Sequence, residues 1–123
     1  MTRHVLDASA ALAHLLDEAG GDRVVPHLKD GLLSAVNLSE VATRLIRTGR
    51  NPIRADYLGC TVVDHDADLA HRTARLWPLT AHLGLSPGDR ACLALAQREG
   101  LPVLTADRAW ATLDLGVDVI LIR

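Results

Sequence analysis

The chain has 123 residues, a length that suits one domain and leaves no room for two. Apolar residues make up 49% and charged residues 23%, values typical of a folded globular protein, which excludes a disordered chain. Aromatic residues make up only 2%, which argues against a protein that stacks nucleic-acid bases on aromatic side chains. The net charge is −2, so the overall charge by itself predicts no nucleic-acid partner.

Cysteine usage and the N-terminal sequence bear on the compartment. Cys60 and Cys92 stand far apart and form no CxxC pair, which indicates a reduced chain. Asp7 falls in the stretch that would form the apolar part of a signal peptide, and no uncharged run reaches the length of a membrane span. We therefore expect a cytoplasmic protein that contacts no membrane.

Short runs of β-branched residues or leucine alternate with helical patterns along the first half of the chain. The expected elements are a strand over residues 3–6, a helix over 8–16 that Gly20 and Gly21 end, a turn of helix over 24–28, a strand over 32–36 and a helix ending near Gly49. The last of these helices is recognised by an apolar face of Leu38, Val41, Ala42, Leu45 and Ile46.

The second half continues the alternation. The expected elements are a turn of helix over 53–59, strands over 61–63, 102–105 and 117–122, a helix over 67–77 that Pro78 kinks or ends, a helix from Ser86 to Glu99 and a short helix over 109–113. Strands that alternate with helices predict a parallel sheet covered on both faces. The expected fold is a three-layer α/β/α sandwich with five parallel strands, in one domain over residues 1–123.

Four acidic residues stand where a parallel α/β protein places its ligand site. Asp7 follows the first expected strand and Asp107 the fourth, while Glu40 and Asp89 stand in the first turns of helices. Ligands of open parallel sheets bind outside the carboxyl ends of the strands. We therefore expect all four carboxylates to meet at one end of the sheet.

Each acid also has a purely structural interpretation. Asp7 could cap a helix. Two pairs have the spacing of a capping box, Asn37 with Glu40 and Ser86 with Asp89. Capping does not require convergence, however, and four acids in one crevice repel one another. A hard divalent cation such as Mg²⁺ or Mn²⁺ would relieve that repulsion. A cation held this way could activate water and stabilise a phosphoryl oxyanion, which is the chemistry of metal nucleases.

The segments VLDASA, SAVNLSEV, SPGDRACLALA and VLTADRAW resemble the PIN-domain ribonucleases, specifically the VapC toxins of VapBC toxin–antitoxin modules. The resemblance runs from Arg3 to Arg123, and GDRACLALA followed by LPVLTADRAW is its most specific part. It implies a PIN-like fold and a metal-dependent endoribonuclease, a hydrolase of RNA phosphodiester bonds. It also implies a type II toxin that is inhibited by a VapB-like antitoxin, as a homodimer or in a complex with that antitoxin.

The resemblance also assigns roles to residues. The catalytic set it implies is Asp7, Glu40, Asp89 and Asp107. Asp7, Asp89 and Asp107 would bind Mg²⁺ or Mn²⁺, and Glu40 or Asp107 would complete the metal shell or orient the attacking water. Two small hydroxyl residues, Ser9 and Thr105, match residues that support the metal ligands in the family.

The basic residues are twelve arginines and one lysine. Some of the arginines stand beside the acids. They contact RNA phosphates, form a solvated helix face or make a subunit contact. These residues are Arg44, Arg47, Arg50 and Arg54 near Glu40, together with Arg90 and Arg108.

Three other functions remain to be weighed. A phosphoacceptor signalling domain shares the fold class but needs a lysine near the last strands, and Lys29 is the only lysine. A PIN fold without catalysis is disfavoured because all four acids are present. The main alternative is a PIN-domain nuclease that acts in RNA processing outside any toxin–antitoxin pair.

Overall fold

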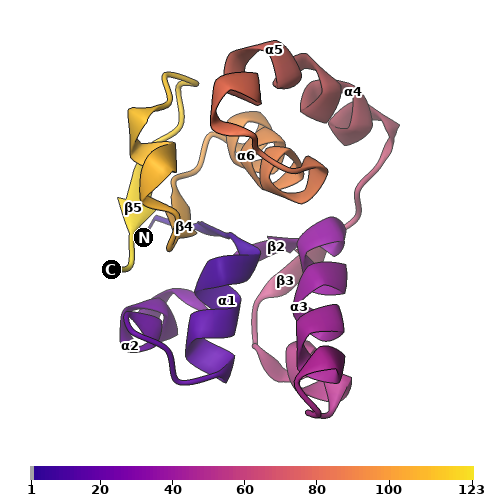
Figure 1. Cartoon of the computed structure of the whole chain (residues 1–123), viewed down its shortest axis with the longest axis vertical. Coiled ribbons are helices and arrows are strands. Elements are labelled where there is room, and N and C mark those ends of the chain that lie inside the picture. Colours follow the sequence, from indigo (N-terminus) through magenta and orange to yellow (C-terminus); the bar gives the residue numbers. More distant parts are fainter. Residues whose placement is uncertain (1) are drawn as a thin grey trace.

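The computed structural model describes residues 2–123 and contains one five-stranded parallel sheet (Figure 1). The strands lie in the order β3-β2-β1-β4-β5. Their bounds are Val5–Leu6 for β1, Leu32–Ser34 for β2, Thr61–Val63 for β3, Val103–Thr105 for β4 and Val119–Leu121 for β5. From β1 the chain adds β2 and β3 on one side, and it then adds β4 and β5 on the other side, so the switch point lies between β1 and β4. Ligands bind at such a switch point because the connections leave it in opposite directions and open a crevice.

Helices cover both faces of the sheet, as Figure 1 shows. The α-helices are α1 (Ala8–Leu15), α2 (Gly21–Val24), α3 (Ala35–Arg47), α4 (Ala67–Arg75), α5 (Trp77–Thr80) and α6 (Pro87–Glu99). Short 3₁₀ segments are η1 (Val25–His27), η2 (Pro52–Tyr57), η3 (Ala81–Leu83) and η4 (Arg108–Thr112). The expected three-layer α/β/α sandwich is confirmed. No helix within residues 2–123 is both long enough and apolar enough to cross a bilayer.

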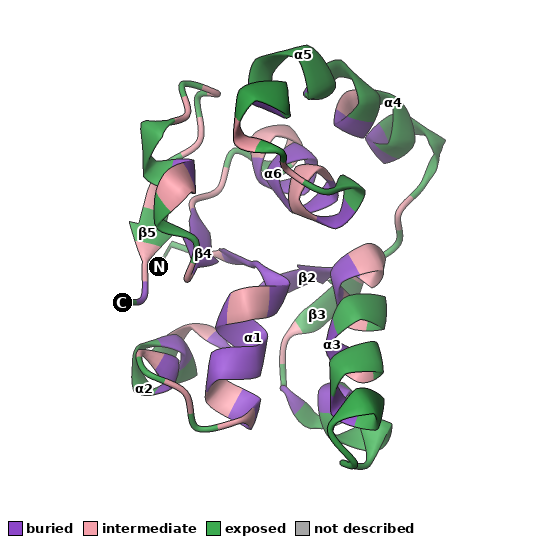
Figure 2. Ribbon diagram, viewed as in Figure 1, coloured by how far each residue is buried: buried purple, intermediate pink, exposed green. Residues whose placement is uncertain are grey.

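The core is divided by the sheet into two clusters, because neighbouring residues of a strand point to opposite faces. Leu6 packs with α1 and α3 on one face, whereas Val5 packs with α6 on the other. Trp110 is fully buried in the α6 cluster. Figure 2 shows α1 mostly buried, while the outer sides of α3 and α4 are exposed. The site is thus carried by two packed layers that meet at a central sheet.

Most boundaries agree with the sequence, and the differences have local causes. Strand β2 ends at Ser34, two residues earlier than expected, because the Ser34 hydroxyl accepts a hydrogen bond from the Val36 N–H and begins α3. Ile46, expected in the core, is 61% exposed. Gly21 begins α2 instead of only ending the previous helix. A Cβ at this position would collide with the Ala13 carbonyl oxygen, which explains the glycine.

Candidate active site

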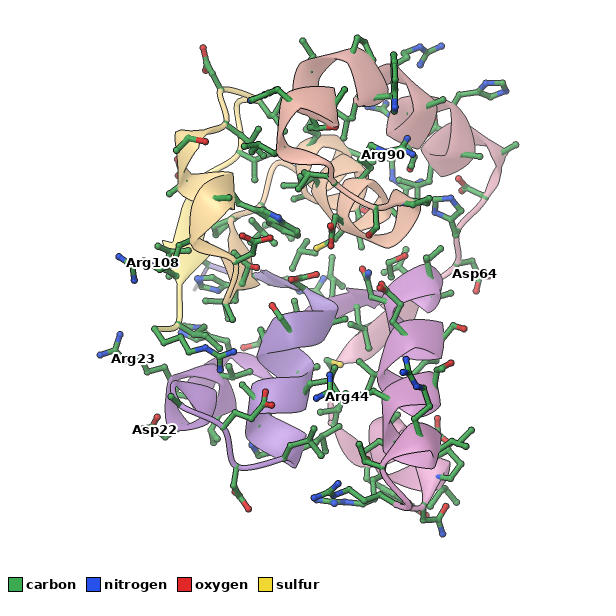
Figure 3. The ribbon with its side chains drawn as sticks, viewed as in Figure 1. Asp22, Arg23, Arg44, Asp64, Arg90 and Arg108 are labelled. Atoms are coloured by element: carbon green, nitrogen blue, oxygen red, sulfur yellow. The ribbon has the colours of Figure 1, made fainter. Side chains whose placement is uncertain are left out.

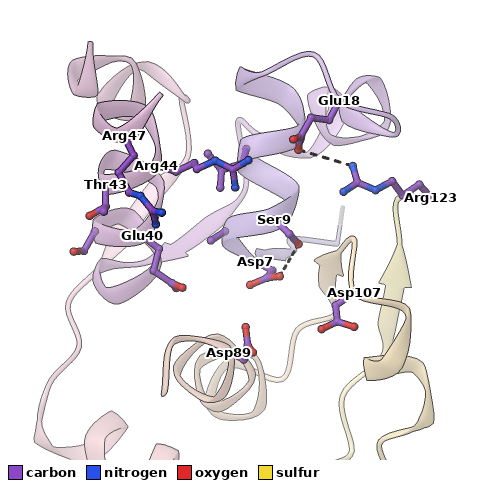
Figure 4. A pocket seen from close by; sticks show the side chains of 13 residues that line it. Asp7, Ser9, Glu18, Glu40, Thr43, Arg44, Arg47, Asp89, Asp107 and Arg123 are labelled. Atoms are coloured by element: carbon purple, nitrogen blue, oxygen red, sulfur yellow. Dashed lines mark hydrogen bonds and ion pairs between the residues drawn. The ribbon is translucent and has the colours of Figure 1, made fainter. Parts of the chain in front are cut away.

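A cleft of about 720 Å³ opens at the carboxyl ends of β1 and β4. Figure 4 shows Asp7 in its centre, with Asp89 of α6 facing it and with Glu40 and Asp107 on either side. All four acids that the sequence singled out line this one cleft, although they come from four separate parts of the chain. The expected convergence at one end of the sheet is therefore observed.

Asp7 is the buried member of the group, with 4% of its surface exposed. It stands at the N-cap position of α1, yet its side chain makes no capping hydrogen bond. Its Oδ2 instead accepts hydrogen bonds from the hydroxyls of Ser9, at 2.6 Å, and Thr105, at 2.9 Å. The capping interpretation is wrong for Asp7, and the supporting role expected for both hydroxyls fits the geometry.

The two hydroxyls are themselves held by the backbone that follows β4. The Ala106 N–H donates to Ser9 Oγ, and the Asp107 N–H donates to Thr105 Oγ1, both at 3.0 Å. Each hydroxyl thus accepts a hydrogen bond from a backbone amide between β4 and η4 and donates one to the Asp7 carboxylate. This arrangement fixes Asp7 relative to the loop that carries Asp107.

The surroundings of Asp7 make its charged form costly. Burial raises its pKa to about 6, against an ordinary 3.8, and the nearby Asp89 charge acts in the same direction. Hydrogen bonds from Ser9, Thr105 and the Ala8 backbone oppose this rise without cancelling it. A carboxylate in such a position gains stability from a nearby cation.

Glu40 reaches the cleft from α3, where it lies in the second helical turn, not the first. The Asn37 side-chain amide donates to Glu40 Oε1 at 2.7 Å. The expected capping box at Asn37 and Glu40 is absent, because Ser34 is the N-cap of α3 and Asn37 is already inside the helix. Glu40 is exposed, and Oε2 is left without a side-chain donor within residues 2–123.

Asp89 does form a capping box at the start of α6. Its Oδ2 accepts from the Ser86 N–H at 3.0 Å, and Ser86 Oγ accepts from the Asp89 N–H at 3.1 Å. The structural interpretation of this acid is therefore correct, and it is compatible with a place in the cleft. Only Oδ2 is used by the cap.

Asp107 caps η4 at the opposite wall, where its Oδ1 accepts from the Ala109 N–H at 3.0 Å. Its side chain is exposed. Glu40, Asp89 and Asp107 share one feature: each carboxylate has one oxygen held by a hydrogen bond, and its other oxygen is available to a ligand. Such anchoring limits rotation of a carboxylate while leaving a free acceptor in the cleft.

The donor set is made only of oxygens, which suits a hard cation such as Mg²⁺ or Mn²⁺. Within residues 2–123, no three His, Cys, Asp or Glu side chains are close enough together to form a ready-made metal site. The acids stand apart on the walls of the cleft. Glu40 and Asp107 are exposed, and each is anchored through one oxygen on its own wall of the cleft.

Arginines form part of the rim. Arg44 and Arg47 of α3 line the cleft, and no side-chain hydrogen bond or ion pair of either is found in the described part of the chain. Arg123 also lines it, but its Nη1 donates to the Ala19 carbonyl oxygen.

The other arginines near the acids in sequence have structural partners. Arg54, Arg90 and Arg108 donate to the carbonyl oxygens of Leu15, Thr73 and Arg123, respectively, and Arg50 donates to that of Thr48. Figure 3 shows Arg44 beside α1 and α3, whereas Arg90 lies between α4 and α6. Sequence proximity to an acid therefore places Arg44 and Arg47 in the cleft, and it does not place the other four there.

Four residues of the site were not expected from the sequence: Glu18 and Arg123, which line the cleft, and Asn37 and Gly88, which join its walls. The Asn37 amide also donates to the Gly88 carbonyl oxygen, at 3.1 Å, and so joins α3 to the first turn of α6. An asparagine inside a helix and a glycine in a first helical turn are both unfavourable for helix formation, which is the signal that could have drawn attention to them.

The fold and the cleft define a parallel α/β sandwich with an acidic site at the switch point of its sheet. The family model for the PIN domain matches residues 4–115. The chain therefore belongs to the PIN-domain family. VapC toxins with PIN domains are nucleases, and PIN-domain nucleases generally depend on divalent metal ions.

Similar solved structures agree with this assignment. A toxin–antitoxin complex from Klebsiella pneumoniae has a TM-score of 0.78 at 16% identity, with 98% of each chain covered. DNA-bound VapBC from Salmonella typhimurium has a TM-score of 0.74 at 19% identity, with 100% of each chain covered. VapC20 from Mycobacterium tuberculosis, a sarcin–ricin loop cleaving toxin, has a TM-score of 0.71 at 20% identity, covering 89% of this chain and 95% of that one. None of the curated proteins matches the sequence.

Proposed function

We propose that this chain is a metal-dependent endoribonuclease and the toxin of a toxin–antitoxin pair. The observation that carries the proposal is the buried Asp7 carboxylate, with its raised pKa, at the centre of a cleft that Glu40, Asp89 and Asp107 also line. Such a group is unfavourable by itself and becomes favourable when a cation neutralises it. Nucleases use this kind of site to hold the ions that activate water.

The role proposed for each residue follows from the hydrogen bonds that hold its side chain. Asp7, Asp89 and Asp107 would hold Mg²⁺ or Mn²⁺, which supplies a polarised water and neutralises charge on the phosphate oxygens. Glu40 is the acid best suited to complete the metal shell and to orient the attacking water, because its Oε1 is fixed by Asn37 and its Oε2 remains an acceptor. Ser9 and Thr105 keep Asp7 in place through Oδ2.

The choice of RNA as substrate rests on the chemistry of the rim and on the family. Arg44 and Arg47 add two guanidinium groups to the wall of an otherwise acidic cleft. Phosphates of a bound strand would contact these cations while one phosphodiester lies over the acids. The similar VapC20 toxin is described as cleaving the sarcin–ricin loop, an RNA target, and we extend the substrate class, not that particular target, to this chain.

The proposed partner is a VapB-like antitoxin. The similar structures from Klebsiella pneumoniae and Salmonella typhimurium are toxin–antitoxin complexes. We propose that the antitoxin places an arginine or lysine among the acids of the cleft, where its charge replaces that of the metal. The free toxin would form a homodimer or bind its antitoxin in a heterocomplex.

Cleavage of labelled RNA by the purified protein tests the function. Cleavage should require Mg²⁺ or Mn²⁺, stop in EDTA, and fall at least a hundredfold in Asp7→Asn. Adding the antitoxin should also stop it. Asp114→Asn, a change at an exposed acid outside the cleft, serves as the matched control and should leave cleavage unchanged. Wild-type cleavage that continues undiminished in EDTA, or cleavage by Asp7→Asn that equals wild type in Mg²⁺, would contradict the proposal.

A further inference from the structure

Asn37 is fully buried inside α3 and contacts both walls of the cleft. Its Nδ2 donates to Glu40 Oε1 on its own helix and to the Gly88 carbonyl oxygen on α6. Its Oδ1 is buried and has no hydrogen-bond partner within residues 2–123. A buried acceptor without a partner destabilises a fold, so Asn37 is a poor choice for stability alone. Both of its donor contacts lead instead to the site.

Gly88 provides the space that this contact needs. A Cβ built at position 88 would lie 2.6 Å from Glu40 Cδ and 2.8 Å from Glu40 Oε2, far inside van der Waals contact. Alanine is otherwise favoured over glycine in a helix. The glycine therefore marks a place where the Glu40 carboxylate lies directly against the first turn of α6.

The atoms that a Cβ would meet belong to the end of a flexible side chain, not to the backbone. An alanine at position 88 can consequently be accommodated by moving the Glu40 carboxylate, with the fold left intact. Asp89, the next residue along α6, is held in the cleft by its capping box. The position of Glu40 relative to Asp89 thus depends on two contacts, the amide of Asn37 and the absence of a side chain at Gly88.

We propose that Asn37 and Gly88 are positioning residues that together hold the Glu40 carboxylate at a fixed place beside Asp89. Asn37 fixes Oε1 by a hydrogen bond, and Gly88 allows the carboxylate to approach α6, so that Oε2 is presented to the cleft. The inference rests on the proposed nuclease function, in which Glu40 belongs to the catalytic set.

The first test is Gly88→Ala. In EDTA the variant should unfold at the same temperature as wild type or slightly higher, because helix propensity improves. Its affinity for Mn²⁺, measured by calorimetry, should fall at least tenfold. The kcat for RNA cleavage should fall at least tenfold while KM for RNA changes less than twofold, because the arginine rim is untouched. In a Glu40→Ala background the same change should leave Mn²⁺ affinity unaltered.

The second test is Asn37→Leu, which keeps the approximate volume of the side chain and removes both hydrogen bonds. The same losses of Mn²⁺ affinity and kcat are expected, again only when Glu40 is present. Asn51→Leu is the matched control, since Asn51 contacts the Ile53 N–H at the start of η2 and does not line the cleft. That control should bind Mn²⁺ and cleave RNA like wild type.

Several results would overturn the proposal. One is Mn²⁺ affinity and kcat within twofold of wild type in both Gly88→Ala and Asn37→Leu; the nuclease function would then stand without it. Another is an equal loss in the Glu40→Ala background, which would show an effect that does not pass through Glu40. If wild type neither binds Mn²⁺ nor cleaves RNA, the proposed function fails. The contact between Asn37 and Glu40 is then tested separately, by nitrogen-15 NMR of the metal-free protein. The Asn37 side-chain amide resonances should then shift in Glu40→Gln, and unchanged resonances would refute it.

Discussion

At the scale of single residues, the cleft depends on an unfavourable buried charge. Asp7 has a pKa of about 6 in the folded protein and an ordinary value of 3.8, so between these two pH values the folded state binds a proton that the unfolded state has released. The metal-free protein should therefore be most stable, as far as Asp7 is concerned, below pH 3.8. This contribution is lost as the pH rises through 6.

Asp7→Asn tests this dependence. At pH 7.5 in EDTA the variant should be more stable than wild type by about 2 kcal/mol, somewhat less than the full shift implies, because the buried amide brings a donor that needs a partner. The difference should shrink as the pH falls from 6 to 4. Urea unfolding across this pH range measures it, with Asp114→Asn as the control for loss of an exposed acid. A difference that is independent of pH would contradict a raised pKa for Asp7.

At the scale of elements, α6 uses one residue for two purposes. Asp89 Oδ2 closes the capping box with Ser86, while the side chain also lines the cleft. A structural and a functional interpretation of an acid are usually set against each other, but a carboxylate has two oxygens and can satisfy both. The start of α6 is thereby fixed at the point where the site needs a charge.

Substitutions around this cap should separate its two purposes. Asp89→Asn keeps an acceptor for the Ser86 N–H, so stability in EDTA should stay within about 0.5 kcal/mol of wild type while cleavage is lost. Asp89→Ala should lose cleavage and also about 1 kcal/mol of stability. Ser86→Ala should lose similar stability and keep most of the activity. Urea unfolding and RNA cleavage, measured on all three variants, give the comparison; full activity in Asp89→Asn would remove Asp89 from the catalytic set.

At the scale of the whole molecule, charge is distributed unevenly around a nearly neutral total. The net charge of −2 conceals a cleft with acids at its centre and the guanidinium groups of Arg44 and Arg47 at its rim. A neutral total is therefore a poor guide to whether a chain binds nucleic acid. The local arrangement of charge decides this, and it becomes visible only in the folded structure.

Replacing both Arg44 and Arg47 by glutamine should weaken RNA binding and reduce its salt dependence. For each arginine that no longer neutralises a phosphate, the slope of log affinity against log salt should fall by about 0.7, so the double variant should show a decrease of about 1.4. Fluorescence titrations of RNA into the inactive Asp7→Asn background measure the slope. Arg23→Gln with Arg75→Gln removes the same charge outside the cleft and is the control. Equal slopes for the two double variants would exclude specific phosphate contacts at the rim.

The sheet and the meeting of the four acids at one cleft were predictable from the sequence, because both depend on local order. A polar residue directly after a buried strand, such as Asp7, has only one end of the sheet to occupy. The contact between Asn37 and Gly88 spans 51 residues, and no local pattern indicates it. Ala35 and Val36 continue the apolar run of β2, so the sequence does not indicate that α3 begins directly after Ser34. Burial of Asp7 likewise depends on Thr105, a residue of another strand.

The separation of Asp7 and Thr105 in the sequence has a consequence for the protein during its synthesis. Thr105 follows Asp7 by 98 residues and must lie beside it, in β4, before the cleft is complete. A ribosome adds about 5 to 20 residues per second, so roughly 5 to 20 seconds pass between the synthesis of the two halves of the cleft. During that time the growing chain carries Asp7 and Glu40 but no assembled site. A nuclease with this strand order therefore has no assembled site while it emerges from the RNA-rich ribosome that makes it.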